Sequence, residues 1–243
     1  EWERVFTNVE WRFKHALKKS SVNSGYMPVI LAPEAISLLL NTIEIAANGR
    51  SRFKGLSVLD GKIGEQIADS KLSIQDKPFY PRGLGSYPFD DEGIVPKPIP
   101  IIEEGRFASF IYDLETAERM NTESTGHASR STGSLPKPSY SNLVFSRGDA
   151  TREQLIRDMD YGLLVFEALG GGMSNVIAGD FSVNVELGYL IENGEVKGRV
   201  KDVMLAGNVF DLLKDIRAMG KYLRRMGDTF VPDILLNKVS VSA

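Results

Sequence analysis

The sequence predicts an α+β protein with a large mixed or mainly antiparallel sheet, hairpins and several packed helices. Helical and strand-like segments are interspersed along the 243 residues without the regular strand–helix alternation of a parallel sheet. Residues 99–112 and 189–203 each have the pattern of a β-hairpin, with apolar runs on both sides of a glycine-containing turn. The turn Asn193-Gly194 is the strongest hairpin signal, because both central residues of a type I′ turn need positive φ.

The first elements in chain order are two helices with a short strand between them. Residues 1–20 are expected to form one amphipathic helix whose apolar stripe packs against the core. That stripe consists of Trp2, Phe6, Val9, Phe13, Ala16 and Leu17. Residues 29–31 are expected to form a short strand and residues 33–47 a largely buried helix. Pro33 suits the first turn of that helix, and the Glu34 carboxylate suits its positive end.

Shorter elements follow. Residues 113–120 and 151–160 are expected to be helices, since each follows a residue that can cap a helix N-terminus. Residues 161–169 form an apolar run of strand length, residues 209–218 read as a further helix, and residues 234–241 read as a final strand.

Composition excludes several classes of function. The chain has no cysteine, which removes disulfides, thiolate zinc sites and cysteine nucleophiles, and its two histidines are too few for a histidine-rich metal site. The formal net charge of −3 disfavours a general nucleic-acid binder. No run of about 18 apolar residues and no signal peptide is recognisable, so we expect no membrane span and a cytoplasmic protein. Because the chain starts at Glu1, we expect a fragment of a longer protein.

Four polar, glycine-rich stretches are candidates for chemistry: residues 85–93, 124–130, 170–182 and 203–208. The first contains Asp90, Asp91 and Glu92, which could bind a hard cation, accept from a peptide amine or act as acid–base groups. Neighbouring side chains in extended backbone alternate between faces, so the three acids cannot all converge on one point. A solvated turn is the simpler alternative for this stretch.

The other three stretches have structural explanations. Ser124 and His127 do not define a nucleophilic triad, which depends on geometry, and His127 is expected to be a surface or hydrogen-bonded residue. The glycines at 170–172 lack the helix and lysine that follow them in a phosphate-binding loop. We expect them to allow close approach of two backbones. Asn208 is expected to cap the helix that follows it.

Seven short segments keep a specific order and spacing between residues 28 and 241. They are residues 52–57, 86–93, 124–126, 141–143, 178–182, 191–194 and 205–208. In this order they resemble the C-terminal part of the TldD/PmbA family. The resemblance implies that residues 28–243 form the α+β C-terminal domain of that family. It also implies that residues 1–27 are a connecting helix from an N-terminal domain that this chain lacks.

The family has two kinds of subunit. TldD-type members carry a His-Glu-x-x-x-His helix and a late cysteine that bind a catalytic metal, which polarises the peptide carbonyl and activates a water. The corresponding helix here, at residues 33–40, has no histidine, and residues 224–228, near the expected cysteine, have no thiol. The chain therefore resembles the PmbA/TldE-like, metal-free branch.

This resemblance implies a non-catalytic subunit. It would bind a TldD-like catalytic subunit or a second copy of itself and help to form a groove where an unfolded peptide substrate adds to a sheet edge. No cofactor, catalytic residue or metal ligand is expected. The residues expected at the partner or peptide surface are Asp90, Asp91, Glu92, Gly93, Thr125, Gly126, Gly171, Gly179, Asp180 and Ser182.

Two alternatives stay open, and so does the question of whether the chain is an enzyme. The first is a stand-alone peptidase whose hard metal ion is held by Asp90, Asp91, Glu92, Asp180 and His127. The second is a regulator of DNA gyrase or of a toxin–antitoxin pair, as the family's name of gyrase modulator implies. Direct nucleic-acid binding is not expected, because the local basic residues read as the charged face and positive end of a helix. Those residues are Arg217, Lys221, Arg224 and Arg225.

Overall fold

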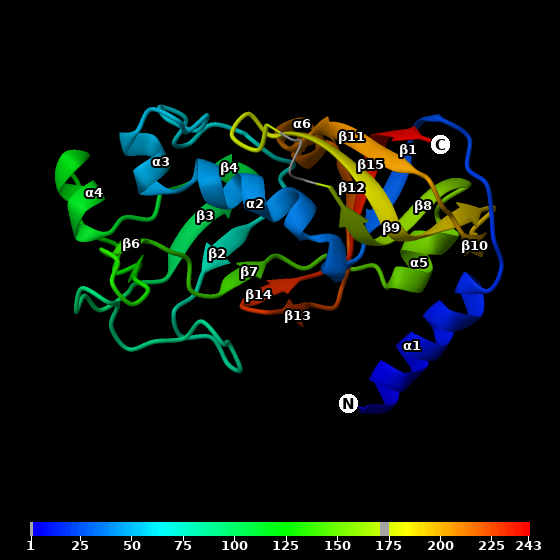
Figure 1. Ribbon diagram of the computed structural model, residues 1–243, viewed down its shortest axis with the longest axis horizontal. Coiled ribbons are helices and arrows are strands. Elements are labelled where there is room, and N and C mark those ends of the chain that lie inside the picture. The colour runs from blue at the N-terminus through cyan, green and yellow to red at the C-terminus, as the bar shows by residue number, and fades with distance from the viewer. Residues whose placement is uncertain (1, 171–174) are drawn as a thin grey trace.

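The structure, a computed structural model, describes residues 2–170 and 175–243. It confirms the predicted α+β class, because the described residues form two large sheets, a two-stranded sheet and six α-helices. In Figure 1 the two large sheets follow one another along the long axis of the molecule, and α1 lies at the end occupied by the larger sheet. Within the described residues, no helix is both long and apolar enough to cross a membrane.

The larger sheet has seven strands, and five of them close into a ring. Its members are β1 (Gly25–Leu31), β8 (Tyr161–Leu169), β9 (Asp180–Glu192), β10 (Glu195–Arg199), β11 (Met204–Asn208), β12 (Ile216–Met219) and β15 (Ile234–Ser242). The order is β1-β8-β9-β11-β15, and β15 pairs back onto β1, while β12 and β10 lie outside the ring. Only the β1–β8 pairing is parallel, so the sheet is mixed but mainly antiparallel as predicted.

The second sheet has six strands in the order β13-β14-β7-β2-β3-β4. These are β13 (Arg224–Met226), β14 (Thr229–Val231), β7 (Leu143–Phe145), β2 (Ile74–Asp76), β3 (Ile99–Glu103) and β4 (Arg106–Phe107). A separate small sheet pairs β5 (Ala128–Ser129) with β6 (Lys137–Pro138). This small sheet and the long loops around it lie at the opposite end of the molecule from α1 (Figure 1).

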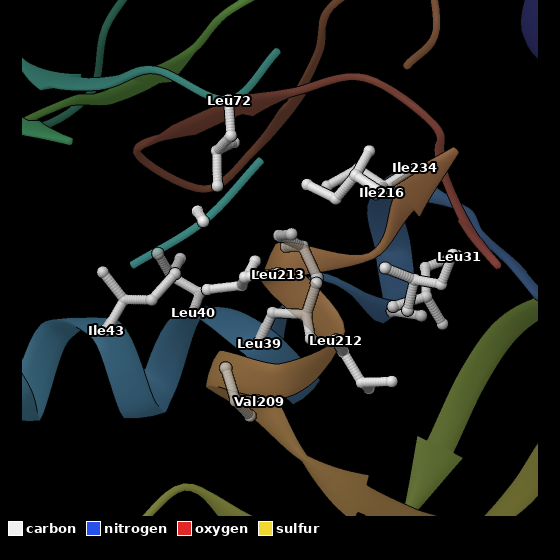
Figure 2. Close-up of a cluster of buried hydrophobic side chains, with 14 of the residues drawn as sticks. Leu31, Leu39, Leu40, Ile43, Leu72, Val209, Leu212, Leu213, Ile216 and Ile234 are labelled. Atoms are coloured by element: carbon white, nitrogen blue, oxygen red, sulfur yellow. The ribbon is translucent and has the colours of Figure 1, made fainter. Parts of the chain in front are cut away.

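The helices are short, apart from α1. They are α1 (Trp2–Ala16), α2 (Ser37–Ala46), α3 (Gly49–Phe53), α4 (Leu114–Arg119), α5 (Arg152–Arg157) and α6 (Val209–Lys214), and a 3-10 turn, η1 (Pro33–Ala35), precedes α2. Figure 2 shows α2 and α6 facing each other through leucines of both helices, among them Leu39, Leu212 and Leu213. Leu39 and Leu213 are fully buried in the main core, which therefore fixes α2 between the two sheets.

Most predicted elements are present, and the turn chemistry explains them. Asn193 and Gly194 have φ of 53° and 75°, as a type I′ hairpin requires, and they join β9 to β10. Asp113 caps α4 through the backbone amide of Thr116, and Thr151 forms a full capping box on α5. The hairpin predicted at 99–112 is shorter than expected, because pairing ends at Phe107.

Two predictions about elements are wrong. The helix expected at 209–218 ends at Lys214, and residues 216–219 form strand β12, which pairs with β15. Arg217 therefore lies on a strand, and Arg224 and Arg225 lie on β13, so the basic cluster is not a helix face.

The apolar stripe of α1 is also only partly a core feature. Trp11 packs against the rings of Phe166 and Tyr189 at centroid distances of 6.3 and 5.5 Å. Trp11 is not part of the predicted stripe, and four residues of that stripe remain largely exposed, with exposed fractions between 59% and 71%: Phe6, Val9, Phe13 and Leu17.

Candidate functional site

The predicted acidic loop is joined to the predicted hydroxyl-rich loop by hydrogen bonds. The buried Asp90 carboxylate accepts from the backbone amides of Glu92 at 3.0 Å and Ile94 at 2.8 Å within its own turn. Its second oxygen accepts from the amide of Ala128 at 3.0 Å, in the other loop. Asp91 accepts in the same way from the amide of Arg130 at 2.7 Å. Asp90 and Asp91 therefore fasten two loops together, so the alternative of a solvated turn does not hold for Asp90.

Glu92 points elsewhere. Its carboxylate accepts from the amide of Leu114 at 2.8 Å, in the first turn of α4, and burial raises its pKa. The three acids thus diverge toward three different backbone segments. Among the described residues, no three His, Asp or Glu side chains gather closely enough to hold a metal ion. The carboxylate metal site of the stand-alone peptidase hypothesis, with Asp180 and His127, is therefore not assembled.

The second loop ends in a buried polar network. Thr125 Oγ1 accepts from the Tyr112 amide at 2.9 Å, and His127 Nδ1 lies 2.8 Å from the Thr125 carbonyl oxygen. His127 Nε2 lies 3.3 Å from Asp76 Oδ1, and both side chains are fully buried. Asp76 also accepts from the amide and hydroxyl of Ser141. His127 is a hydrogen-bonded buried residue, and Ser141 bonds to the carboxylate rather than to the imidazole, so this trio is not a nucleophilic triad.

The remaining predicted residues lie on the larger sheet. Gly179, with φ of 89°, and Asp180 precede and begin β9, and Asp180 Oδ1 accepts from Asn208 Nδ2 at 2.9 Å. Ser182 lies opposite Ala206 in the β9–β11 pairing. Gly171 lies outside the described residues. The predicted surface therefore divides into two groups, one on β9 and one on the loops beside β5 and β6.

Helix α2 begins beside the group on β9 and ends near the small sheet of β5 and β6. Near its start, Leu38 and Asn41 line a hollow of about 170 Å³ together with Asp180 of β9. Just beyond its end, Asn48 donates from its side-chain amide to the carbonyl oxygen of Pro138 in β6, at 3.1 Å. The exposed residues of α2, Ser37 and Asn41, therefore line the hollow beside Asp180.

A larger hollow, of about 460 Å³, lies at the C-terminal end of α2. Its wall is made from α2, α3, β6 and the turn that joins β13 to β14, and it includes Glu44, Lys137 and Asp228. Burial, followed by the charges of Asp228 and Asp76, raises the pKa of Glu44 to about 7. Sequence reasoning missed this residue, although Glu44 is the only charged residue between 35 and 49.

An ionic cluster forms where η1 meets β13 and α1. Glu34 Oε1 accepts from Arg12 of α1 and, at 2.9 Å, from Arg224 of β13. Burial opposes ionisation of Glu34, but the hydrogen bond from Arg12 and the charges of Arg224 and Arg12 outweigh it and lower the pKa. Arg152 forms a second pair with Asp233, with Nη2 and Oδ1 2.6 Å apart. The sequence analysis assigned Glu34 only to the helix dipole and missed these partners.

Arginine stacking extends this cluster into the core. The guanidinium carbon of Arg12 lies 3.9 Å from the Phe166 ring centroid, and that of Arg152 lies 5.0 Å from the same ring. The Tyr189 hydroxyl donates to the Arg12 carbonyl oxygen at 2.9 Å. The three arginines and two acids give the cluster an excess positive charge, which disfavours a divalent cation at Glu34.

Comparison with known proteins gives a consistent result. A family model described as the PmbA/TldA metallopeptidase C-terminal domain matches residues 24–243. A protein of Methanothermobacter thermautotrophicus named "Metalloprotease" is 32% identical over 209 residues, which cover 86% of this chain and 46% of the relative. The "Metalloprotease PmbA homolog" of Haemophilus influenzae is 30% identical over 226 residues, which cover 93% of this chain and 48% of the relative. The chain thus spans about half the length of these curated relatives.

The crystal structure of TldE from Thermococcus kodakarensis is similar over 99% of this chain and 55% of that one, with a TM-score of 0.93 and 30% identity. Sequence and fold therefore agree, and the resemblance found in the sequence is confirmed. With residues 24–243 matched by the family model, the chain belongs to the PmbA/TldA metallopeptidase family and contains its C-terminal domain.

Proposed function

We propose that this chain is a non-catalytic, PmbA/TldE-like subunit of a TldD/PmbA-type metallopeptidase assembly. In this role it binds the subunit that holds the catalytic metal and helps to form the peptide-binding groove. The observation that carries the proposal is the state of Glu34. If Glu34 takes the place of the glutamate in the His-Glu-x-x-x-His helix of TldD-type members, Pro33 and Leu38 take the places of its two histidines.

The surroundings of Glu34 support this assignment. A glutamate that takes a proton from a metal-bound water works best when its pKa lies near the working pH, whereas Arg12 and Arg224 lower the pKa of Glu34. Here Glu34 Oε1 accepts from two arginines, and Arg224 belongs to the segment near which TldD-type members have their cysteine ligand. The two regions that carry metal ligands in the catalytic branch still meet in this chain, but the ion pair between Arg224 and Glu34 joins them.

Partner binding has separate support. Four large apolar side chains of α1 are exposed along one stripe: Phe6, Val9, Phe13 and Leu17. A contiguous apolar stripe on an exposed helix is typical of a surface that another polypeptide covers. The hollow beside Asp180 and the larger hollow at the C-terminal end of α2 provide surface for an extended peptide.

Reconstitution tests the proposal. The full-length protein is purified alone, and after co-expression with a sister subunit that carries the His-Glu-x-x-x-His helix. Size-exclusion chromatography and cleavage of a fluorescently labelled unfolded polypeptide are then measured. We expect co-elution, with chelator-sensitive cleavage only when the sister subunit is present.

A pair of matched variants assigns the chemistry. Replacing the motif glutamate of the sister subunit by glutamine should abolish cleavage, whereas Glu34→Gln in this chain should retain more than half of it. Stoichiometric zinc in the isolated protein together with chelator-sensitive cleavage would overturn the proposal. Failure of the two proteins to co-elute, with cleavage unaffected by this chain, would do the same.

A further inference from the structure

The hollow at the C-terminal end of α2 carries two carboxylates without bonding partners. Glu44 of α2 and Asp228 of the β13–β14 turn both line it. Within the part of the chain that the structure describes, neither carboxylate accepts a hydrogen bond or forms an ion pair with a side chain. The charge of the exposed Asp228 raises the pKa of Glu44, so a cation bound between the two carboxylates would relieve this repulsion.

The hollow has the dimensions and lining of a binding site rather than of a packing defect. Its volume of about 460 Å³ lies within the range of roughly 300–1,000 Å³ found for small-molecule sites. Ile45 and Leu56 provide apolar surface, and most of the other lining residues are polar or charged, among them Asn48 and Tyr140. The Tyr140 hydroxyl donates to the Glu44 carbonyl oxygen at 3.0 Å, so it holds the end of α2 in place beside the hollow.

We propose that this hollow binds the ammonium group of a peptide, supplied either by its N-terminus or by a lysine side chain, between the carboxylates of Glu44 and Asp228. An alkylammonium ion provides three N–H donors and one positive charge, which match two acceptor carboxylates. The choice of a peptide, rather than another amine, rests on the proposed function in a peptidase assembly.

The other charged groups around the hollow fit the same ligand. Arg50, Lys54 and Lys137 also line it, from α3, the residue after α3 and β6. When the ammonium group of a peptide lies between Glu44 and Asp228, these positive charges can attract the carbonyl or carboxylate oxygens of the same peptide. At Glu44 itself, the charges that shift the pKa are those of Asp228 and Asp76, and both raise it.

The proposal predicts a proton linkage. Burial, Asp228 and Asp76 raise the pKa of Glu44 to about 7, so near neutral pH a large fraction of Glu44 is protonated in the free protein. A bound ammonium ion favours the ionised carboxylate and therefore lowers this pKa. Binding near pH 7 should then release a proton, and the affinity should rise as the pH increases from 6 to 8.

Calorimetry with three short probes tests the proposal on the full-length protein. Tri-alanine amide offers only an N-terminal ammonium, and N-acetyl-Ala-Lys-Ala amide offers only a lysine ammonium. N-acetyl-tri-alanine amide offers neither. We expect one or both of the first two probes to bind at pH 8, and the third to bind at least tenfold more weakly. Which of the first two binds identifies the source of the ammonium group.

Variants and buffers complete the test. Glu44→Gln and Asp228→Asn should each weaken binding of the ammonium probe by about tenfold or more, and Glu44→Gln should also abolish proton release, measured in buffers of different ionisation enthalpy. Glu118→Gln, an exposed acid on α4 outside the hollow, should leave binding unchanged. Circular dichroism shows which variants fold, and Asp228→Asn, in an exposed turn, provides the decisive comparison if Glu44→Gln does not fold.

Three results would overturn the inference: no binding of either ammonium probe at 5 mM concentration, equal binding of the third probe, or unchanged affinity in both pocket variants. Such results leave co-elution and sister-dependent cleavage untouched. Loss of co-elution with intact ammonium binding, in contrast, refutes the proposed subunit role but not the pocket. The binding site and the subunit role can therefore be refuted independently of each other.

Discussion

At the scale of single residues, two positions of the predicted surface require glycine for different physical reasons. Gly126 has φ of +71°, and a Cβ atom there would lie 2.6 Å from the Pro96 Cα. Gly93 has a similar φ of +79°, but a Cβ atom there would meet open space. Backbone conformation accounts for both positions, whereas close approach of another backbone accounts only for Gly126.

This difference predicts unequal effects of alanine. Gly126→Ala should destabilise the protein by roughly 2–4 kcal/mol, because a left-handed alanine is strained and the Cβ also displaces the 95–96 backbone. Gly93→Ala should cost only about 1 kcal/mol, since it introduces the strain alone. Urea unfolding of both variants checks this, and equal losses would contradict the contact assigned to Gly126.

Sequence reasoning located these loops but not the role of their side chains. Polar, glycine-rich composition was sufficient to identify the stretches that contain Asp90 and Thr125. It could not show that Asp90 accepts from the amide of Ala128, 38 residues away, because hydrogen bonds between distant loops leave no periodic pattern. Glu44 was missed for a related reason, since its hollow exists only once α3, β6 and the β13–β14 turn are assembled around it.

At the scale of elements, Arg12 connects α1 to the rest of the molecule. Its guanidinium group bonds to Glu34 and stacks on Phe166, and its carbonyl oxygen accepts from Tyr189. The stripe of exposed apolar residues on α1 contributes little to this attachment. The position of α1 therefore depends on a few polar contacts and on Trp11.

Removing the arginine should loosen the helix. We expect Arg12→Ala to weaken the docking of α1 by roughly 1.5–3 kcal/mol, the range for hydrogen bonds to charged groups. Hydrogen exchange should then show at least about tenfold faster exchange in residues 6–16, with the sheets unaffected.

The matched control is Lys14→Ala on the same helix, whose ion pair with Glu10 is exposed and should contribute almost nothing. If the two variants exchange alike, the Arg12 contacts do not hold α1.

Strand β12, which was predicted to be the end of a helix, shows the limit of what a local sequence pattern can predict. Residues 216–219, Ile-Arg-Ala-Met, continue the apolar spacing of α6 and have no strong helix breaker before them. Their partner is Ile234–Leu236 of β15, and pairing with this buried strand decides their conformation. The β9–β10 hairpin, in contrast, was predictable because its signal lies within the turn itself.

At the scale of the whole molecule, the pH dependence of stability should carry a signature of Glu44. Its pKa is about 7 in the folded protein and 4.5 when unperturbed, so the folded state binds more protons between these values. Stability should therefore decrease as pH rises from about 4.5 to 7 because of this residue.

Glu44→Gln should remove that decrease, and above pH 7 it should make the protein more stable than the wild type. Thermal unfolding measured from pH 4.5 to 8 checks the sign, with Glu118→Gln as the control. Glu34 acts in the opposite direction, because its lowered pKa adds stability that is lost only as the pH falls below about 4.5. An unchanged slope in Glu44→Gln would show that the residue titrates normally.

The closed ring of β1, β8, β9, β11 and β15 limits the strand edges that could pair with another protein molecule. Where a strand of this ring is paired on both sides, it leaves no open edge that another chain could extend; among the shortest of these pairings is β1–β8, which covers Val29–Leu31. Among the described strands, those that end the two large sheets are β10 and β12 on one sheet, and β4 and β13 on the other. Each of these is five residues or shorter, which keeps the risk of accidental polymerisation small.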